Sequence, residues 1–206
     1  MPHSSTRDGS PTLPKGFQGA KRWLNQLVDF EKTRLRRFSA IEMKLERMQK
    51  LMKALGNPQN SVRCVHVAGT NGKGSVSHMV DTMMRGVGYT VGRYTSPHLT
   101  DVRERISVGG VEIDKTAFGE VITKVAEAAK SVDLEPTFFE AMTAAAFVHF
   151  ESEAVDLAVI EVGMGGRLDC TNIIEPVLTI ITRLDIDHAP ILGNSLEKLL
   201  PRRLES

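Results

Sequence analysis

The sequence predicts an α/β protein built on a mainly parallel sheet, with a phosphate-binding loop and flanking helices. Three observations lead to this prediction. A glycine-rich segment at 69–75 (GTNGKGS) separates a short apolar run from a stretch with helical spacing. Two later runs, at 156–162 and 177–182, are almost continuously apolar, as in strands covered on both faces. Strand and helix patterns alternate, which is typical of a parallel sheet with right-handed crossovers.

The first part of the chain is predicted to be helical after a disordered lead-in. Residues 1–16 are rich in Ser, Pro and Gly and show no periodicity. Apolar residues then recur at helical spacing in two segments, the second of which stops at Gly56-Asn57-Pro58. These apolar residues are Trp23, Leu24, Leu27 and Val28 in the first segment, and Ile41, Leu45, Met48, Met52 and Leu55 in the second.

The central part of the chain reads as a βαβ unit followed by a hairpin. We expect strands at 62–67 and 89–94, joined by the glycine-rich loop and a helix at 76–87. A tight hairpin is expected at 106–113 around Gly109-Gly110.

Two further helices are expected before the last strands. Asp114 can cap a helix that runs to about Lys130. Thr137 and Glu140 have the spacing of a capping box, which opens a helix to about Ser152.

The composition excludes several classes of protein. Of 206 residues, 41% are hydrophobic and 25% are charged, which is typical of a globular chain and not of a disordered one. No apolar run approaches the roughly 18 residues that span a bilayer, and the first residues lack the apolar core of a secretory signal. Cys64 and Cys170 are too few for a disulfide framework. We therefore expect a cytoplasmic protein without a membrane partner, and leave mitochondrion and plastid open.

The net charge of +1 is unevenly distributed. Residues 1–60 contain 12 Lys/Arg against 5 Asp/Glu, whereas residues 61–206 contain 14 against 20. A basic front is found in nucleic-acid-binding proteins and in transit peptides. Here most of the charges lie on a helical pattern interleaved with Glu, which favours a solvated helix face and no nucleic-acid partner.

The loop at 69–75 is the strongest candidate for ligand binding. Its glycines let backbone N–H groups turn toward phosphate oxygens, and the following helix adds the positive end of its dipole. Lys73 would supply an ammonium group to the β- and γ-phosphates. The spacing departs from the standard G-x-x-x-x-G-K-[ST], because a glycine separates Lys73 from the hydroxyl residue. The candidate residues are Gly69, Thr70, Asn71, Gly72, Lys73, Gly74 and Ser75.

Polar residues also follow the other predicted strands, where the ligand crevice of a parallel sheet lies. Glu161 ends one strand and could hold Mg²⁺ or form a structural salt bridge. His188 follows the last strand, as a ligand or as a surface histidine. Ser96 could offer a hydroxyl to a metal. Arg103 and Arg105 could pair with a substrate carboxylate or form a solvated edge.

Five motifs in one order carry a resemblance to a known family. They are HVAGTNGKGSV, YTSPHLTDVRERI, PTFFEAMTAAAF, LAVIEVGMGGRLDCTNII and ITRLDIDHAPILGNSLE. Together they resemble the folylpolyglutamate synthase/dihydrofolate synthase family of the Mur ligase superfamily, over about residues 17–200. The resemblance implies the ATP-binding domain of that superfamily. It also implies a reaction in which ATP activates a folate or dihydropteroate carboxylate as an acyl phosphate, which the amine of L-glutamate attacks.

The resemblance also implies roles for residues. The loop at 69–75 matches the ATP loop, Ser96 and Glu161 match ligands of a first Mg²⁺, and Glu161 with His188 match those of a second. The segment 96–105 resembles a substrate loop, and the PTFFE motif lies beside the active site in the family. The substrate-loop candidates are Ser96, Pro97, His98, Arg103, Arg105, Phe139 and Glu140. For Glu140, capping of its helix is an adequate structural explanation.

The end of the sequence departs from the family pattern. Where the family has a lysine that is usually carbamylated, this chain has Arg203, within a divergent tail at 201–206. The later strands and the C-terminal domain of the family are also absent. We therefore expect a truncated ATP-binding domain at 17–200 that does not complete the reaction alone. A nucleotide-binding regulatory module without ligase activity and another Mur-type ligase remain as alternatives. The sequence does not choose between dihydropteroate and folate, nor does it indicate an oligomeric state.

Overall fold

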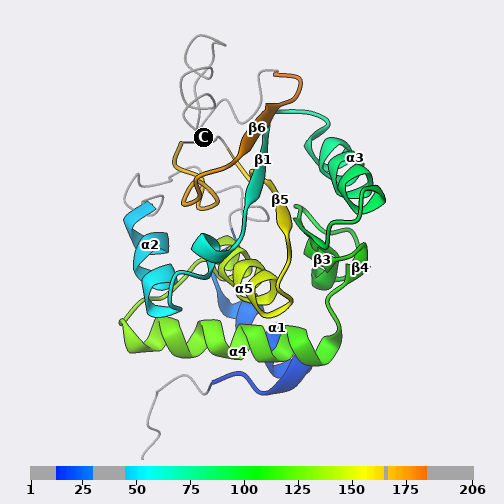
Figure 1. Cartoon of the computed structure of the whole chain (residues 1–206). Helices are drawn as coiled ribbons and strands as arrows, with labels where there is room; N and C mark the ends of the chain where they lie inside the picture. The colour runs from blue at the N-terminus through cyan, green and yellow to red at the C-terminus, as the bar shows by residue number, and fades with distance from the viewer. Residues whose placement is uncertain (1–12, 30–44, 165–166, 185–206) are drawn as a thin grey trace, which may run out of the picture.

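A six-stranded sheet organises the computed structural model, which describes residues 13–29, 45–164 and 167–184 (Figure 1). The strand order is β4-β3-β2-β5-β1-β6. The strands are β1 (Cys64–Ala68), β2 (Val91–Tyr94), β3 (Ile106–Val108), β4 (Val111–Glu112), β5 (Leu157–Glu161) and β6 (Leu178–Ile181). The parallel pairs β2–β5, β5–β1 and β1–β6 confirm the predicted mainly parallel sheet, and β3 and β4 add the predicted hairpin at one edge.

Helices cover both faces of this sheet. They are α1 (Gly16–Gln26), α2 (Leu45–Ala54), α3 (Lys73–Gly86), α4 (Lys115–Ser131) and α5 (Phe138–Ser152), with short 3₁₀ turns η1 (Pro58–Ser61) and η2 (Val102–Arg105). No helix among the described ranges is long and apolar enough to cross a membrane. Residues 1–12, 30–44, 165–166 and 185–206 lie outside the description, and with them most of the predicted lead-in, His188 and the tail.

The alternation of side chains along the central strands separates two cores. Ala158 and Ile160 of β5 belong to a large core that includes α5, whereas Leu157 and Val159 belong to a smaller core beneath α3. Both sets are buried, because a strand sends successive side chains to opposite faces of its sheet. This explains why the sequence of β5 is continuously apolar.

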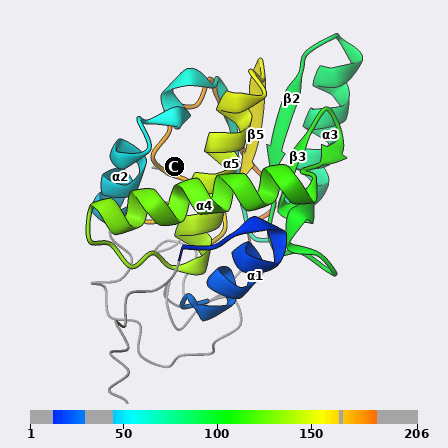
Figure 2. The same ribbon diagram turned by 90° about the horizontal axis from the view of Figure 1, so that it is seen from below.

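The large core is formed by several layers of helix. α5 lies between the sheet and α4, and is buried on nearly all sides (Figures 1 and 2). α1 packs along α4, and α2 also contacts α4 (Figure 2). The predicted capping box of α5 is confirmed: Thr137 accepts from the N–H of Glu140, and the Glu140 carboxylate accepts from the N–H of Thr137.

The opposite face is covered by α3, which begins at the glycine-rich loop 69–75. Its first residue is Lys73, three residues before the predicted start, because Gly72 with φ 86° serves as the N-cap. Its C-terminal turn extends to Tyr89, whose N–H donates to the Met84 carbonyl, so β2 begins later than predicted. β5 lies between β1 and β2, which were expected to form a βαβ unit; the two strands are parallel but not adjacent.

A buried ion-pair cluster holds α3 on the sheet. The Asp81 carboxylate, in the middle of α3, accepts from Arg93 of β2 at 2.7 Å and from Arg85 at 2.9 Å. The Asp81 side chain is 1% exposed and that of Arg93 is 11% exposed. The orientation of the helix that follows the phosphate loop therefore depends on charge pairing as well as on apolar packing.

Candidate functional site

Three of the predicted site segments meet at one edge of the sheet. They are the loop at 69–75, the segment that begins at Ser96 and the side chain of Glu161, which follow or end the parallel strands β1, β2 and β5. The carboxyl ends of parallel strands lie at the same edge, where ligands of open α/β sheets bind. The structure therefore places Glu161 beside both Ser96 and Gly74.

The backbone of the loop requires glycine at two positions. Gly69 has φ 142° and Gly72 has φ 86°, conformations that L side chains rarely adopt. A Cβ atom at Gly69 would lie 1.9 Å from Oγ1 of Thr182, so the loop passes directly against the end of β6. The carbonyl of Arg183 accepts from the N–H groups of Thr70 (2.9 Å) and Asn71 (3.3 Å), which fixes the first half of the loop.

The loop presents the features that a phosphate group needs. It leads into the N-terminus of a 14-residue helix, and Asn71, Gly72 and Ser75 are exposed. Helix N-termini attract anions through free N–H groups and the helix dipole. The Lys73 ammonium lies 3.4 Å from the carbonyl of Thr70, folded back over the loop. The residues present therefore fit a nucleotide phosphate.

Glu161 lies between the phosphate loop and the segment after β2. It is 3% exposed, and its Oε2 accepts from the backbone N–H of Ser96 at 3.3 Å. A Cβ atom at Gly74 would lie 3.7 Å from the same oxygen, so the carboxylate borders the loop directly. An acid and a serine hydroxyl beside a phosphate loop are a donor set that suits Mg²⁺, which keeps several water and phosphate ligands.

The described residues do not by themselves form a complete metal cage. Within 13–29, 45–164 and 167–184, no three His, Cys, Asp or Glu side chains cluster closely enough to hold a metal ion. Mg²⁺ is usually held by one or two protein oxygen ligands together with phosphate and water, and Ser96 and Glu161 are the two candidates. The third predicted ligand, His188, lies outside the described residues.

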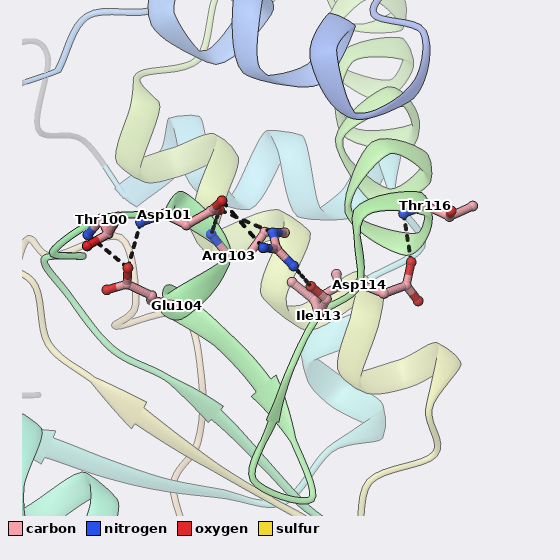
Figure 3. A network of polar contacts seen from close by, with 7 residues as sticks. All are labelled: Thr100, Asp101, Arg103, Glu104, Ile113, Asp114 and Thr116. Atoms are coloured by element: carbon pink, nitrogen blue, oxygen red, sulfur yellow. Dashed lines mark hydrogen bonds and ion pairs between the residues drawn. The ribbon is translucent and has the colours of Figure 1, made fainter.

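The segment after Ser96 is organised by its own carboxylates. Glu104 accepts from the backbone N–H groups of Asp101 and Thr100 (Figure 3) and from that of Leu99. These hydrogen bonds lower the pKa of its carboxyl. Asp101 caps η2 by accepting from the N–H of Arg103. The Arg103 guanidinium then pairs with Asp101 and donates to the carbonyl of Ile113 (Figure 3).

Arg105 does not lie on a solvated edge, and that alternative is wrong for this residue. Its side chain is 1% exposed, and Nε donates to Nδ1 of His98 at 2.8 Å. Its guanidinium lies 5.0 Å from the centre of the Phe138 ring, a cation–π distance. Alternating charges in the sequence suggested a surface, but Arg105, the last residue of η2, lies inward beside His98. Pro97 is exposed.

Phe139 and Glu140, the two candidate residues of the PTFFE motif, have different surroundings. Phe139 packs beneath the loop that follows Glu161, because a Cβ atom at Gly163 would lie 2.3 Å from its ring. Its ring centre is 5.9 Å from that of Tyr94. The Glu140 carboxylate caps α5 and pairs with Arg47 at 3.2 Å, which confirms the structural explanation of this acid.

A buried polar chain near the site escaped the sequence analysis. His66 of β1 has no exposed surface and contacts Thr171, whose hydroxyl donates to Asp169. Asp169 is buried, and burial raises the pKa of its carboxyl. The sequence offers one signal, a histidine within the apolar segment CVHVA. Its partners lie more than 100 positions away in the sequence and could not be inferred from spacing.

Comparison with known proteins places these features in context. No protein-family model matches the chain. Over 188 residues the chain is 39% identical to the dihydrofolate synthase/folylpolyglutamate synthase of Bacillus subtilis, a match that covers 89% of this chain and 42% of that protein. Over 163 residues it is 40% identical to the dihydrofolate synthetase of Saccharomyces cerevisiae, covering 78% of this chain and 38% of the relative.

Solved structures give the same result. E. coli FolC in complex with DHPP and ADP superposes with a TM-score of 0.83 at 29% identity, over 95% of this chain and 45% of that one. Folylpolyglutamate synthase of Mycobacterium tuberculosis complexed with ADP superposes with a TM-score of 0.81 at 34% identity, over 92% of this chain and 41% of that one. The chain spans less than half the length of each of these four proteins.

Proposed function

The chain is homologous to the amino-terminal part of the folylpolyglutamate and dihydrofolate synthases, and on that premise we propose that it is the ATP-binding part of a glutamate ligase. The ligase would join L-glutamate to the carboxylate of a folate or of dihydropteroate. The observation that supports this most directly is the position of Glu161, between the phosphate loop and Ser96. The related structures with ADP support the nucleotide.

The proposed chemistry follows from the poor reactivity of a carboxylate. Transfer of the γ-phosphoryl group of ATP to that carboxylate forms an acyl phosphate and releases ADP. The amine of L-glutamate then attacks the acyl carbon, and phosphate leaves as the amide bond forms. Charge on the transferred oxygens is the main barrier, so stabilisation of that charge is the principal task of the protein.

Each residue of the site has a task in this scheme. Backbone N–H groups of 69–75 and the N-terminus of α3 would hold the phosphates, and the Lys73 ammonium would approach the β- and γ-phosphates. Ser96, Glu161 and His188 would hold Mg²⁺, which supplies positive charge at the transferred phosphoryl group. The segment from Pro97 to Arg105, with Phe139, would line the side of the acceptor substrate.

Calorimetric titration of the 206-residue chain with Mg·ADP tests the nucleotide site. We expect Lys73→Ala to weaken binding at least tenfold, because a charge-assisted contact to phosphate is lost. The matched control is Lys130→Ala, at an exposed lysine in the last turn of α4, which should leave affinity unchanged. Equal affinity of the Lys73→Ala variant and the wild type would contradict the assignment of the loop.

A second assay separates ligation from nucleotide binding alone. Phosphate release that requires ATP, L-glutamate and a folate or dihydropteroate acceptor together would support the ligase. Comparison of a tetrahydrofolate and dihydropteroate as acceptors would then identify the substrate.

A further inference from the structure

We propose that His66 and Thr171 are positioning residues of the nucleotide site. In this proposal, the hydrogen-bonded chain from His66 through Thr171 to Asp169 holds the loop that follows Glu161 against β1, the strand that leads into the phosphate loop. The inference rests on the proposed function for the identity of the site. It extends that function by assigning a task to His66, Thr171 and Asp169. No contact described above joins these residues to the phosphate loop or to Ser96.

The hydrogen-bonded series begins at the Asp169 carboxylate, which organises the loop. Asp169 Oδ2 accepts from the N–H of Met164 at 2.7 Å, and Oδ1 accepts from the N–H of Thr171 at 2.9 Å. Oδ1 also accepts from the Thr171 hydroxyl at 2.6 Å. One carboxylate thus gathers groups from both ends of the stretch 164–171. This stretch begins three residues after Glu161.

The hydrogen-bonded series continues to β1 through the Thr171 hydroxyl. Thr171 Oγ1 lies 2.9 Å from His66 Nε2, and both residues are completely buried. His66 is paired in register with Ile160 of β5 on one side and Thr179 of β6 on the other. It therefore stands on the strand between them, three residues before the phosphate loop begins at Gly69.

The directions of these hydrogen bonds fix the protonation of the imidazole. With the Asp169 carboxylate ionised, the Thr171 hydroxyl gives its one proton to Asp169, so its oxygen accepts from His66 Nε2–H. The ring is therefore the neutral Nε2–H tautomer. Its Nδ1 is buried without a hydrogen-bond partner among the described residues, so a proton there would find no acceptor. Burial accordingly lowers the pKa of His66 to about 4.

The geometry separates the proposed task from ordinary strand pairing. Val162 N–H already donates to the carbonyl of Val67 at 2.9 Å, so β5 is fixed to β1 up to that residue. Beyond Val162 the backbone leaves the ladder, and Phe139 supports Gly163 from one side. The Thr171–His66 hydrogen bond ties the far end of this loop back to β1.

Two pairs of variants test the proposal in the 206-residue chain. Thr171→Val keeps the shape and removes the hydroxyl, whereas Thr171→Ser keeps the hydroxyl. His66→Gln places an amide N–H near the position of Nε2, whereas His66→Asn is too short to do so. The probe is Mg·ADP, measured by calorimetric titration, with the Lys73→Ala variant in parallel. Loss of a group that is hydrogen-bonded to a metal ligand typically costs about 10–100-fold in affinity, and these residues act one step further from the ligands.

We expect Thr171→Val and His66→Asn to weaken Mg·ADP binding about tenfold, and Thr171→Ser and His66→Gln to change it less than about threefold. A purely structural defect would also lower affinity, so the tautomer is measured directly. In ¹⁵N-histidine-labelled protein at pH 7, the His66 ring should show the neutral Nε2–H form in the wild type and in Thr171→Ser. Thr171→Val should alter that signal.

Three results would overturn the proposal. They are an Nδ1–H tautomer of His66, equal Mg·ADP affinity of Thr171→Val and wild type, and a Thr171→Ser variant as weak as Thr171→Val. Failure of the proposed function is distinguishable from these results, because it would appear as a Lys73→Ala variant that binds Mg·ADP as the wild type does. In that case the tautomer measurement still decides whether the hydrogen-bonded chain exists.

Discussion

Replacement of Asp81 by asparagine should destabilise the protein strongly, because it removes a charge from a buried cluster. The Asp81 carboxylate neutralises Arg93, whose side chain is 11% exposed, over a distance of 2.7 Å. A buried guanidinium without its carboxylate costs about 3–5 kcal/mol of unfolding free energy. This is a large fraction of the roughly 5–15 kcal/mol that stabilises a typical domain.

The arrangement also predicts how the neighbours of Asp81 behave. Arg85 pairs with the same carboxylate but its side chain is 34% exposed, so Arg85→Gln should cost no more than about 1 kcal/mol. In the double variant Asp81→Asn/Arg93→Met both buried charges are absent. This variant should recover much of the loss, since it leaves neither charge of the pair buried without its partner.

Urea unfolding at pH 7, followed by far-ultraviolet circular dichroism, measures these differences. The three variants and the wild type should unfold with similar dependence on urea and with different midpoints. A loss below about 1 kcal/mol for Asp81→Asn would refute the argument from buried charge. A double variant less stable than Asp81→Asn would show that Arg93 contributes through its shape and not its charge.

Three further predictions concern the strands and the loop. Gly69→Ala should cost about 1–3 kcal/mol in thermal unfolding, because alanine disfavours φ 142°, and should also weaken Mg·ADP binding. Gly92→Ala should cost about 1–3 kcal/mol, since its methyl would lie 2.7 Å from the Phe150 ring; Phe150→Leu in the same chain should recover part of this. Burial lowers the pKa of His66 to about 4 in the folded state, against 6.5 in the unfolded chain. The contribution of the neutral ring to the free energy of unfolding is therefore complete above pH 6.5. As the pH falls from 6.5 to 4, about 3 kcal/mol should be lost, and His66→Gln should flatten that part of the pH profile in urea unfolding.

The sequence predicted those features that depend on local pattern. The glycine-rich loop, the strands on either side of it and the capping box at Thr137 and Glu140 are all set by residues a few positions apart. The boundary error at α3 was also local, since Gly72 ends the loop earlier than the apolar pattern begins. Such elements can be recognised because spacing alone decides which groups meet.

The features that sequence analysis missed depend on tertiary contacts. The inward turn of Arg105 is decided by His98 and by Phe138, a residue from a distant helix. Nothing near Thr171 in the sequence indicates its contact with His66. Alternating or isolated polar residues look the same whether they face water or a buried partner, and only the fold distinguishes the two cases.

The central position of β1 affects how the protein emerges from the ribosome. β1 ends at Ala68, but its first partner strand begins at Leu157 and its second at Leu178. At about 5–20 residues per second, the nascent chain carries this apolar strand for roughly 5–20 seconds before either partner has been synthesised. During that time both edges of β1 are open to other chains. A chaperone that covers β1 would therefore be needed mainly between the synthesis of β1 and that of β5, and a pause in translation between them would lengthen the exposure.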